Sequence, residues 1–294
     1  MKSAFLSYLL IVAITGGAGV TAGYIGKKLL GGVNEIIVGD PEANQADSKE
    51  LLKRYNENPS LVNSFKPVDL VNIACEKYRQ EENCYSYGTG VGETIVSQTI
   101  RNYQIKNGNS YFEESISNSS MVHVANRVLQ EGDKSTAKKV DLYKGEAKSA
   151  TTATYPTTPK SYEPDKYKNM MGKTLDRMFI YILSEQTVIA DKCKTEKTED
   201  GYKVTLQLDN EFATPLYKFQ MKNIAGLDGY PSFNNLTHVY TLDNELNLKK
   251  YVVDETYSAT MGLTVTVHNS IEYTCFPGEY LKIPELNETL NYTL

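Results

Sequence analysis

The chain has no tryptophan and only three histidines among its 294 residues. His123, His238 and His268 are far apart in sequence, and each lies within a predicted strand. Isolated histidines of this kind are usually surface or packing residues, and no HxxxH or CxxC spacing is present to hold zinc. The G-x-S-x-G motif of serine hydrolases is absent as well. The sequence therefore predicts a protein that is not an enzyme, with no catalytic residue, metal ligand or cofactor.

The chain also lacks an excess of basic residues. Its 31 lysines and arginines are outnumbered by 36 aspartates and glutamates, which gives a net charge of −5. A general nucleic-acid binder needs a basic stripe to neutralise phosphates, so we expect no nucleic-acid partner. Gly88–Gly92 has alternating glycines like a phosphate loop, but the Lys-Ser/Thr ending is missing. A flexible turn or bulge is the predicted structure there.

Charged residues are absent from residues 3–26, and residues 4–14 form an almost continuous apolar run. A membrane span requires roughly 20 mostly apolar residues. Residues 1–28 are therefore predicted to be either an uncleaved transmembrane anchor or a signal peptide cut after Val20-Thr21-Ala22. A buried helix of a soluble protein is the third alternative. We expect a single-pass protein of the cell membrane with its folded part extracytoplasmic, or a secreted protein if this segment is cleaved.

Cysteine is scarce, at four residues: Cys75, Cys84, Cys193 and Cys275. An even count in an exported chain permits two disulfides, in any of three connectivities. We favour Cys75–Cys84, because these two are close in sequence, and Cys193–Cys275, because each lies on a predicted strand. The alternative is that some of them are free thiols packed as small apolar residues.

Tyrosine, in contrast, is unusually frequent, at 22 residues. Together with many serines, threonines and asparagines it is typical of a β-rich protein with a polar surface. Two interpretations of the tyrosines stay open. They line an amphipathic cavity or groove, or they fill half-exposed sheets in place of tryptophan and phenylalanine.

The first half of the chain is predicted to contain a spacer, two helices and an antiparallel meander. Residues 29–66 form a glycine-containing spacer with a short helix at Ser48–Asn56, and Pro67 suits the first turn of a second helix. Strands are predicted at residues 94–105, 110–117, 121–129 and 137–143, with the hairpin signal Asn107-Gly108 after the first. The Thr-, Ser-, Ala- and Pro-rich stretch at about residues 145–165 is predicted to be an exposed loop.

The second half begins with an amphipathic helix over Met171–Ile182, followed by a second meander. Strands are predicted at residues 187–198, 202–208, 233–242, 248–259 and 263–275. Between the second and third of them, Pro215 and Gly226 bracket a short helix. Residues 277–294 are predicted to be an irregular tail.

This order of elements predicts an α+β fold, in which the membrane helix or signal is followed over residues 67–276 by a curved antiparallel β-sheet, a half-barrel, covered by helices. The arrangement resembles the lipoprotein-carrier superfamily typified by LolA, LolB and LppX, on the strand sequences Gly201–Leu206, Leu236–Asp243 and Lys250–Tyr257. The resemblance covers Pro67–Cys275 in outline. It implies that a lipid or acyl chain lies between sheet and helices, with the Met171–Ile182 helix as a lid. An uncleaved anchor departs from the family pattern, since such carriers are released or lipidated.

The predicted function is therefore that of an extracytoplasmic, membrane-associated protein that binds an apolar ligand, such as a lipid, between sheet and helices. The candidate ligand-binding residues are Met171, Leu175, Met178, Phe179, Ile182, Tyr202, Val204, Leu206 and Tyr240. The alternative is a membrane-anchored subunit of a cell-envelope complex that presents sheet edges and tyrosines to a protein partner. In either case residues 3–26 are predicted to contact the membrane.

Overall fold

The structure is a computed structural model that describes residues 44, 46–94, 96–120, 122–132, 136–225, 227–260, 262–286 and 288. The predicted anchor or signal at residues 1–28 lies outside these described residues. Among the helices that are described, none is long and apolar enough to cross a membrane.

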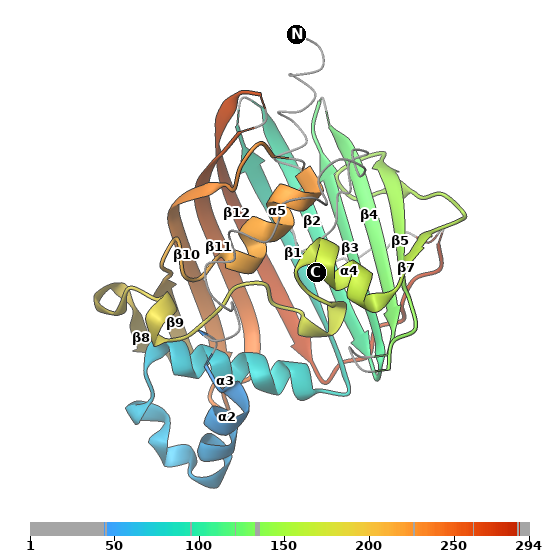
Figure 1. Cartoon of the computed structure of the whole chain (residues 1–294). Helices are drawn as coiled ribbons and strands as arrows, with labels where there is room; N and C mark the ends of the chain where they lie inside the picture. The colour runs from blue at the N-terminus through green and yellow to red at the C-terminus, as the bar shows by residue number, and fades with distance from the viewer. Residues whose placement is uncertain are drawn as a thin grey trace.

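A single open antiparallel sheet of 12 strands dominates the fold (Figure 1). Its first half contains β1 (Asn83–Glu93), β2 (Ser97–Asn107), β3 (Ser110–Asn118), β4 (His123–Glu131), β5 (Val140–Ala147), β6 (Ala153–Thr154) and β7 (Lys160–Tyr162). Its second half contains β8 (Lys194–Lys197), β9 (Gly201–Gln207), β10 (Ser232–Asp243), β11 (Leu248–Thr260) and β12 (Thr264–Pro277). The spatial order is β6-β5-β4-β3-β2-β1-β12-β11-β10-β9-β8, with β7 paired to β5. The prediction of a large antiparallel sheet accompanied by helices is confirmed.

The helices lie on one face of this sheet, which we call the front face; the opposite one is the rear face (Figure 1). Strands β9 to β12 alternate as the sequence predicts. Val204, Leu206 and Tyr240 are buried on the front face, whereas Lys203 and Thr241, on the rear face, are exposed. The alternation follows from the two-residue period of a strand, which places successive side chains on opposite faces.

Two tight turns fix the strand register. Between β2 and β3, Gly108 has φ 57°, a left-handed conformation that glycine adopts without strain, and the predicted hairpin is confirmed. Between β10 and β11, the Asp243 carboxylate accepts hydrogen bonds from the backbone N–H groups of Glu245 at 3.0 Å and Asn247 at 2.8 Å. These bonds satisfy backbone donors that the turn leaves out of the ladder.

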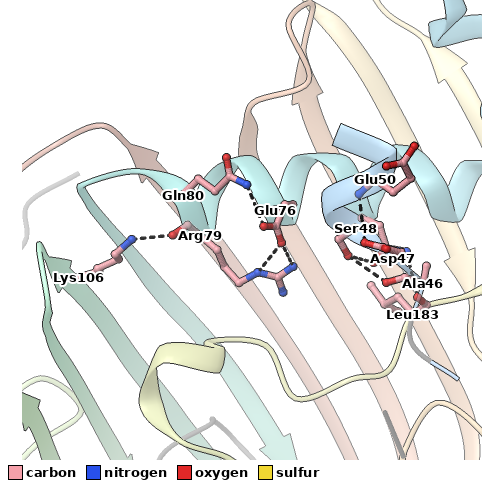
Figure 2. A network of polar contacts seen from close by, with 10 residues as sticks. Ala46, Asp47, Ser48, Glu50, Glu76, Arg79, Gln80, Lys106 and Leu183 are labelled. Carbon is pink, nitrogen blue, oxygen red and sulfur yellow. Dashed lines mark hydrogen bonds and ion pairs between the residues drawn. The ribbon is translucent and has the colours of Figure 1, made fainter. Parts of the chain in front are cut away.

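Two helices precede the sheet: α2 (Ser48–Glu57) and, after the 3-10 helix η2 (Pro59–Ser64), α3 (Pro67–Gln80). Both were predicted, and Pro67 is the first residue of α3. Asp47 caps α2, because its carboxylate accepts a hydrogen bond from the backbone N–H of Glu50 at 3.1 Å (Figure 2).

Polar contacts fasten α3 to its surroundings. Lys106 Nζ on β2 donates to the carbonyl oxygen of Arg79 at 2.6 Å, near the C-terminus of the helix (Figure 2). Within α3, Arg79 pairs with Glu76. On its inner side Asn72 donates to the carbonyl oxygen of Leu183 at 3.0 Å. The helix is therefore anchored to β2 at one end and, in its middle, to the backbone of Leu183.

The prediction of an amphipathic helix over Met171–Ile182 is wrong in its bounds. Helix α4 (Pro164–Met171) ends at Gly172, which has φ 75° and donates its N–H to the carbonyl oxygen of Lys168 at 2.7 Å. A glycine in this left-handed conformation is a common helix C-cap. The chain then continues over Gly172–Ser184 without α-helix or strand. We call Gly172–Ser184 the cover segment, because it lies over the front face.

Two further predictions are wrong in the same region of the chain. The strand expected at residues 187–198 is reduced to β8, preceded by short 3-10 turns and one isolated bridge between Val188 and Leu208. The loop expected at residues 145–165 contains the end of β5 and the short strands β6 and β7. The helix predicted at Pro215 is present as α5 (Pro215–Ala225), on the front face (Figure 1); Gly226 lies outside the described residues.

The alternating glycines at Gly88–Gly92 form neither a turn nor a bulge, so that prediction is wrong as well. They lie within β1, which pairs with β2 and β12 without a register shift. Glycine is required there for space: a Cβ on Gly90 would lie 2.2 Å from the carbonyl oxygen of Ser270. The two halves of the sheet therefore meet along a strand that has little side-chain bulk.

The C-terminal tail covers the rear face of the first half. Leu281 and Ile283 pack against a rear-face cluster that contains Ile105 and Phe112. The Arg127 guanidinium donates to three carbonyl oxygens of the tail, those of Glu285 at 2.9 Å, Leu286 at 2.7 Å and Glu288. The described part of the tail has neither helix nor strand, as predicted.

Candidate functional site

A cavity of about 70 Å³ lies between the front face and the cover segment. Its floor comes from β2, β3 and β10 to β12, and its cover includes Met178–Tyr181 and Tyr217 of α5. Most of the lining side chains are aromatic or aliphatic, and Asn102, Gln104, Glu113, Glu114, His238 and Glu255 add polar groups. Such a combination is what binding sites for small organic molecules usually present.

A row of three stacked tyrosines crosses the floor. Tyr240, Tyr251 and Tyr273 occupy directly paired positions on β10, β11 and β12. Their ring centroids are 5.7 Å apart between the first two and 4.4 Å apart between the last two. The row ends at Gly88, where a Cβ would lie 2.5 Å from the Tyr273 ring. The glycine is therefore what leaves room for the last ring.

Glu255 on β11 is the acid of the floor, and it is 1 % exposed. Its Oε2 accepts a hydrogen bond from the Tyr181 hydroxyl of the cover segment at 2.6 Å. Its Oε1 accepts from the Tyr217 hydroxyl of α5 at 3.0 Å and from Asn269 Nδ2 at 2.9 Å. Burial raises the pKa of Glu255 to about 7, although these three hydrogen bonds favour the ionised form. The carboxyl group therefore titrates near neutral pH.

His238 on β10 is 1 % exposed and lies beside this acid in the cavity wall. Its Nδ1 is 3.0 Å from the Tyr240 hydroxyl oxygen, and its ring stands edge to face with Tyr181, at 4.4 Å between centroids. Burial lowers the pKa of His238 to about 3, so the ring is neutral at physiological pH. Its Nε2 has no hydrogen-bond partner among the described residues.

A second buried acid, Glu113 on β3, also lines the cavity, but a cation compensates it. Lys173 Nζ of the cover segment lies 2.8 Å from Glu113 Oε1, and Gln104 Nε2 donates to the same oxygen at 3.1 Å. Gln104 also donates to the carbonyl oxygen of Met178 at 3.3 Å. Side chains from β2 and β3 thus hold the cover segment in place.

The cavity includes three of the nine predicted ligand-binding residues: Met178, Phe179 and Tyr240. The other six, Met171, Leu175, Ile182, Tyr202, Val204 and Leu206, are buried in the main core without lining the cavity. The helical spacing of Met171, Leu175 and Ile182 identified buried residues correctly, although most of the predicted helix is absent. No bound molecule tests a ligand-binding role for any of the nine.

Sequence reasoning missed the polar members of the site, above all Glu255 and His238. The alternation Leu236-His238-Tyr240-Leu242 already placed the histidine on the apolar face. Glu255 carried a weaker signal, because it follows Asp254 and the pair looks like a solvated face. In β11, however, Glu255 shares its face with the buried Tyr251 and Tyr257.

The four cysteines are free thiols, so the two predicted disulfides are not formed. The pairing Cys193–Cys275 is also excluded by topology. Cys193 contacts Gln207 of β9, and β10 and β11 lie between β9 and the strand of Cys275. Three strand spacings correspond to roughly 14 Å, twice the reach of a disulfide. Cys75 of α3, Cys84 of β1 and Cys275 of β12 are instead buried near one another, where α3 packs against the sheet.

Metal ligands do not gather anywhere in the described part of the chain, where no three His, Cys, Asp or Glu side chains are placed to hold an ion. His123 is exposed on β4 and pairs with Asn118 at 2.7 Å, and His268 contacts Asp254 on the rear face at 3.2 Å. The chemistry of the site therefore rests on Glu255, His238 and the tyrosines.

Comparisons with known proteins do not assign the chain to a family. No family model and no curated protein matches the chain. Among solved structures, the crystal structure of an inactive mutant of the CurK dehydratase has 10 % identity and a TM-score of 0.12, with 73 % of this chain and 83 % of that one covered. Such a low score supports no conclusion on fold or activity. None of these comparisons supports the resemblance to the lipoprotein-carrier superfamily, which stays a prediction.

Proposed function

We propose that the protein is an extracytoplasmic, membrane-associated binder of an apolar ligand, held between the front face of the curved sheet and the cover segment. The observation that supports the proposal is the cavity beneath the cover segment, whose walls are mainly tyrosine, phenylalanine and aliphatic side chains. Tyrosine offers a large apolar area together with a polar tip, which suits a ligand with an apolar body and a polar end.

The size of the cavity limits what it holds in this conformation. Its volume is about 70 Å³, whereas an apolar cavity of roughly 150 Å³ accommodates benzene. A small head group fits, and an acyl chain fits only when the cover segment moves outward. Apart from the 3-10 turn Leu175–Arg177, this segment has no helix or strand, so its outward movement breaks no strand pairing.

Native mass spectrometry of the purified full chain tests this proposal. We expect adducts of apolar ligands on the unmodified protein, and their loss in Val253→Phe, which fills the cavity. The matched control is Val252→Phe, the neighbouring position on the rear face of β11, which we expect to keep the adducts. Circular dichroism establishes that both variants fold.

Two results would overturn the proposal: a full chain that carries no adduct after incubation with lipid extracts, or adducts that survive in Val253→Phe. The alternative function, a protein-interaction subunit of the cell envelope, predicts the first of these results together with co-purification of a protein partner by the anchored form.

A further inference from the structure

The buried glutamates of the sheet differ in their partners. Glu113 pairs with Lys173 at 2.8 Å, and Glu114 on the rear face pairs with Arg127 at 2.9 Å. Glu255 is equally buried, yet its hydrogen-bond partners, Tyr181, Tyr217 and Asn269, are all neutral. Among the described residues, no lysine or arginine forms an ion pair with it. A buried carboxylate without a cation is costly, so it either binds a proton or pairs with a cation from outside.

The remaining acceptor capacity of the site lies in the cavity wall. A carboxylate oxygen can accept two hydrogen bonds. Among the described residues, Glu255 Oε2 accepts one, from the Tyr181 hydroxyl. His238 Nε2 has no partner among the described residues, and the side chain is 1 % exposed. In the tautomer whose Nδ1–H donates to the Tyr240 hydroxyl oxygen, Nε2 presents a lone pair. A ligand that complements Glu255 Oε2 and this tautomer of His238 must donate hydrogen bonds.

The rest of the lining suits a positive charge. His238 is neutral, and burial raises the pKa values of Tyr181, Tyr217, Tyr240 and Tyr251 well above their ordinary value, so these groups stay uncharged. The positive charge of Lys173 is matched by Glu113. Aromatic rings attract cations through their π electrons, most strongly where water is excluded. The only uncompensated ionisable group of the described cavity wall is therefore an acid.

We propose that the cavity binds the protonated amine head group of its ligand, a primary or secondary alkylammonium, with Glu255 as the counter-charge and His238 Nε2 as a second acceptor. This inference rests on the proposed function, since it assigns the head group of the ligand bound in the same cavity. The volume of about 70 Å³ suits a head group of roughly three heavy atoms, by proportion to the benzene-sized cavity.

Isothermal titration calorimetry of the purified full chain with hexylammonium, hexanol and hexanoate, at pH 8, tests the inference. We expect hexylammonium to bind most tightly and hexanoate least. In Glu255→Gln, hexylammonium should lose at least about tenfold in affinity, the loss of one charge-assisted hydrogen bond, while hexanol stays within about twofold. The matched control is Glu272→Gln, an exposed residue on the rear face of β12, which should change neither.

A pH series separates a direct role of Glu255 from a change in fold. Since the pKa of Glu255 is about 7 in the free protein, hexylammonium affinity should rise about tenfold or more from pH 5.5 to pH 8. Hexanol affinity should stay level, and Glu255→Gln should remove the rise. The other groups at this end of the cavity do not titrate in this range, because His238, Tyr181 and Tyr217 stay neutral. Asp254 lies on the rear face, outside the cavity lining.

The outcomes distinguish the two proposals. Hexanol binding as tightly as hexylammonium, or an unchanged hexylammonium affinity in Glu255→Gln, would overturn the amine assignment and leave apolar-ligand binding intact. Absence of binding by all three compounds overturns both.

Discussion

The two halves of the sheet bury their side chains in different ways. In β9 to β12 one face is buried and the other is polar, as in β11, where buried and half-buried residues alternate from Tyr251 to the end of the strand. In β2 and β3 residues of both faces are buried over most of the strand. A sheet with one wet face needs cover on one side only, whereas the first half needs cover on both.

The cover of the rear face comes from far away in the sequence. Residues 278–286 and 288 lie across it, held by the Arg127 guanidinium, which also pairs with Glu114. The corresponding surface of the second half carries exposed ion pairs such as Lys250–Glu272 at 2.6 Å. On the rear face of the first half, charged side chains are therefore part of the buried structure. On the rear face of the second half they are exposed and only keep the surface solvated.

Replacing Arg127 by Met should have the largest effect. The change leaves Glu114 as a buried carboxylate without its cation and releases three tail carbonyls, so we expect a loss of about 3–5 kcal/mol in the free energy of unfolding. Urea unfolding followed by circular dichroism measures it. The control is Lys250→Met, which breaks an ion pair whose side chains are 42 % and 50 % exposed and should cost less than about 1 kcal/mol. Equal losses of unfolding free energy in the two variants would contradict a structural role of the Arg127–Glu114 pair.

Replacing Glu255 by Gln should change the pH dependence of stability in the second half. The pKa of Glu255 is raised from 4.5 to about 7 on folding, so the folded state holds a proton that the unfolded state releases. Stability from this group is full below pH 4.5 and falls as pH rises through 7, by up to about 3 kcal/mol. Glu255→Gln should abolish that fall, and Glu272→Gln should preserve it.

His238 contributes with the opposite sign in the same experiment. Its pKa is lowered from 6.5 to about 3 on folding, so its contribution is full above pH 6.5 and is lost as pH falls toward 3. The two slopes oppose each other between pH 4.5 and 6.5, where stability should be nearly level. In Glu255→Gln only the contribution of His238 to the pH dependence remains, so the free energy of unfolding should rise up to pH 6.5 and then stay constant. A profile that stays level between pH 4.5 and 6.5 in that variant, as in the unmodified chain, would assign the raised pKa to another group.

The difference in burial between the two halves also explains which parts of the fold the sequence predicts. Strands β9 to β12 were predicted nearly to their ends, because a single buried face leaves a two-residue period such as Tyr202-Val204-Leu206. Strand β1 was missed, since Gly88 and Gly90 supply no side chain to the period and look like a loop. Strands β2 and β3 were predicted from their β-forming residues and the Asn107-Gly108 turn, although burial on both faces removes the two-residue period. The docking of the tail is a tertiary contact without any local signal.

The residues of the candidate site likewise fall into those that the sequence predicts and those that it does not. Apolar periodicity located Met178, Phe179 and Tyr240, because burial of apolar side chains follows from local pattern. It did not locate Glu255, since the partners that make its burial tolerable, Tyr181 and Tyr217, come from the cover segment and α5. The helix predicted through the cover segment failed at Gly172, whose left-handed conformation ends α4.

Replacing Gly90 by Ala should strain the boundary between the two halves. The added Cβ would lie 2.2 Å from the carbonyl oxygen of Ser270 on β12, a backbone atom that moves only with its strand. Overpacking of this kind typically costs about 1–3 kcal/mol. Its neighbour Thr89 is exposed, so Thr89→Ala should change the free energy of unfolding by no more than about 0.5 kcal/mol. Urea unfolding of both variants measures the difference, and a Gly90→Ala variant as stable as the unmodified chain would show that β1 and β12 separate easily.

The smallest effect concerns thiol reactivity and needs no substitution. Cys193, next to the edge strand β8, is half-buried, whereas Cys75, Cys84 and Cys275 are buried where α3 packs against the sheet. Burial also raises the pKa of Cys75 to about 12 and that of Cys84 to about 11, which suppresses the reactive thiolate. We expect iodoacetamide at pH 8 to modify Cys193 alone in the folded chain and all four thiols after unfolding without reductant, as read by peptide mass spectrometry. A disulfide found between any two of the four would contradict free thiols, and early modification of Cys84 or Cys275 would show that α3 separates from the sheet in solution.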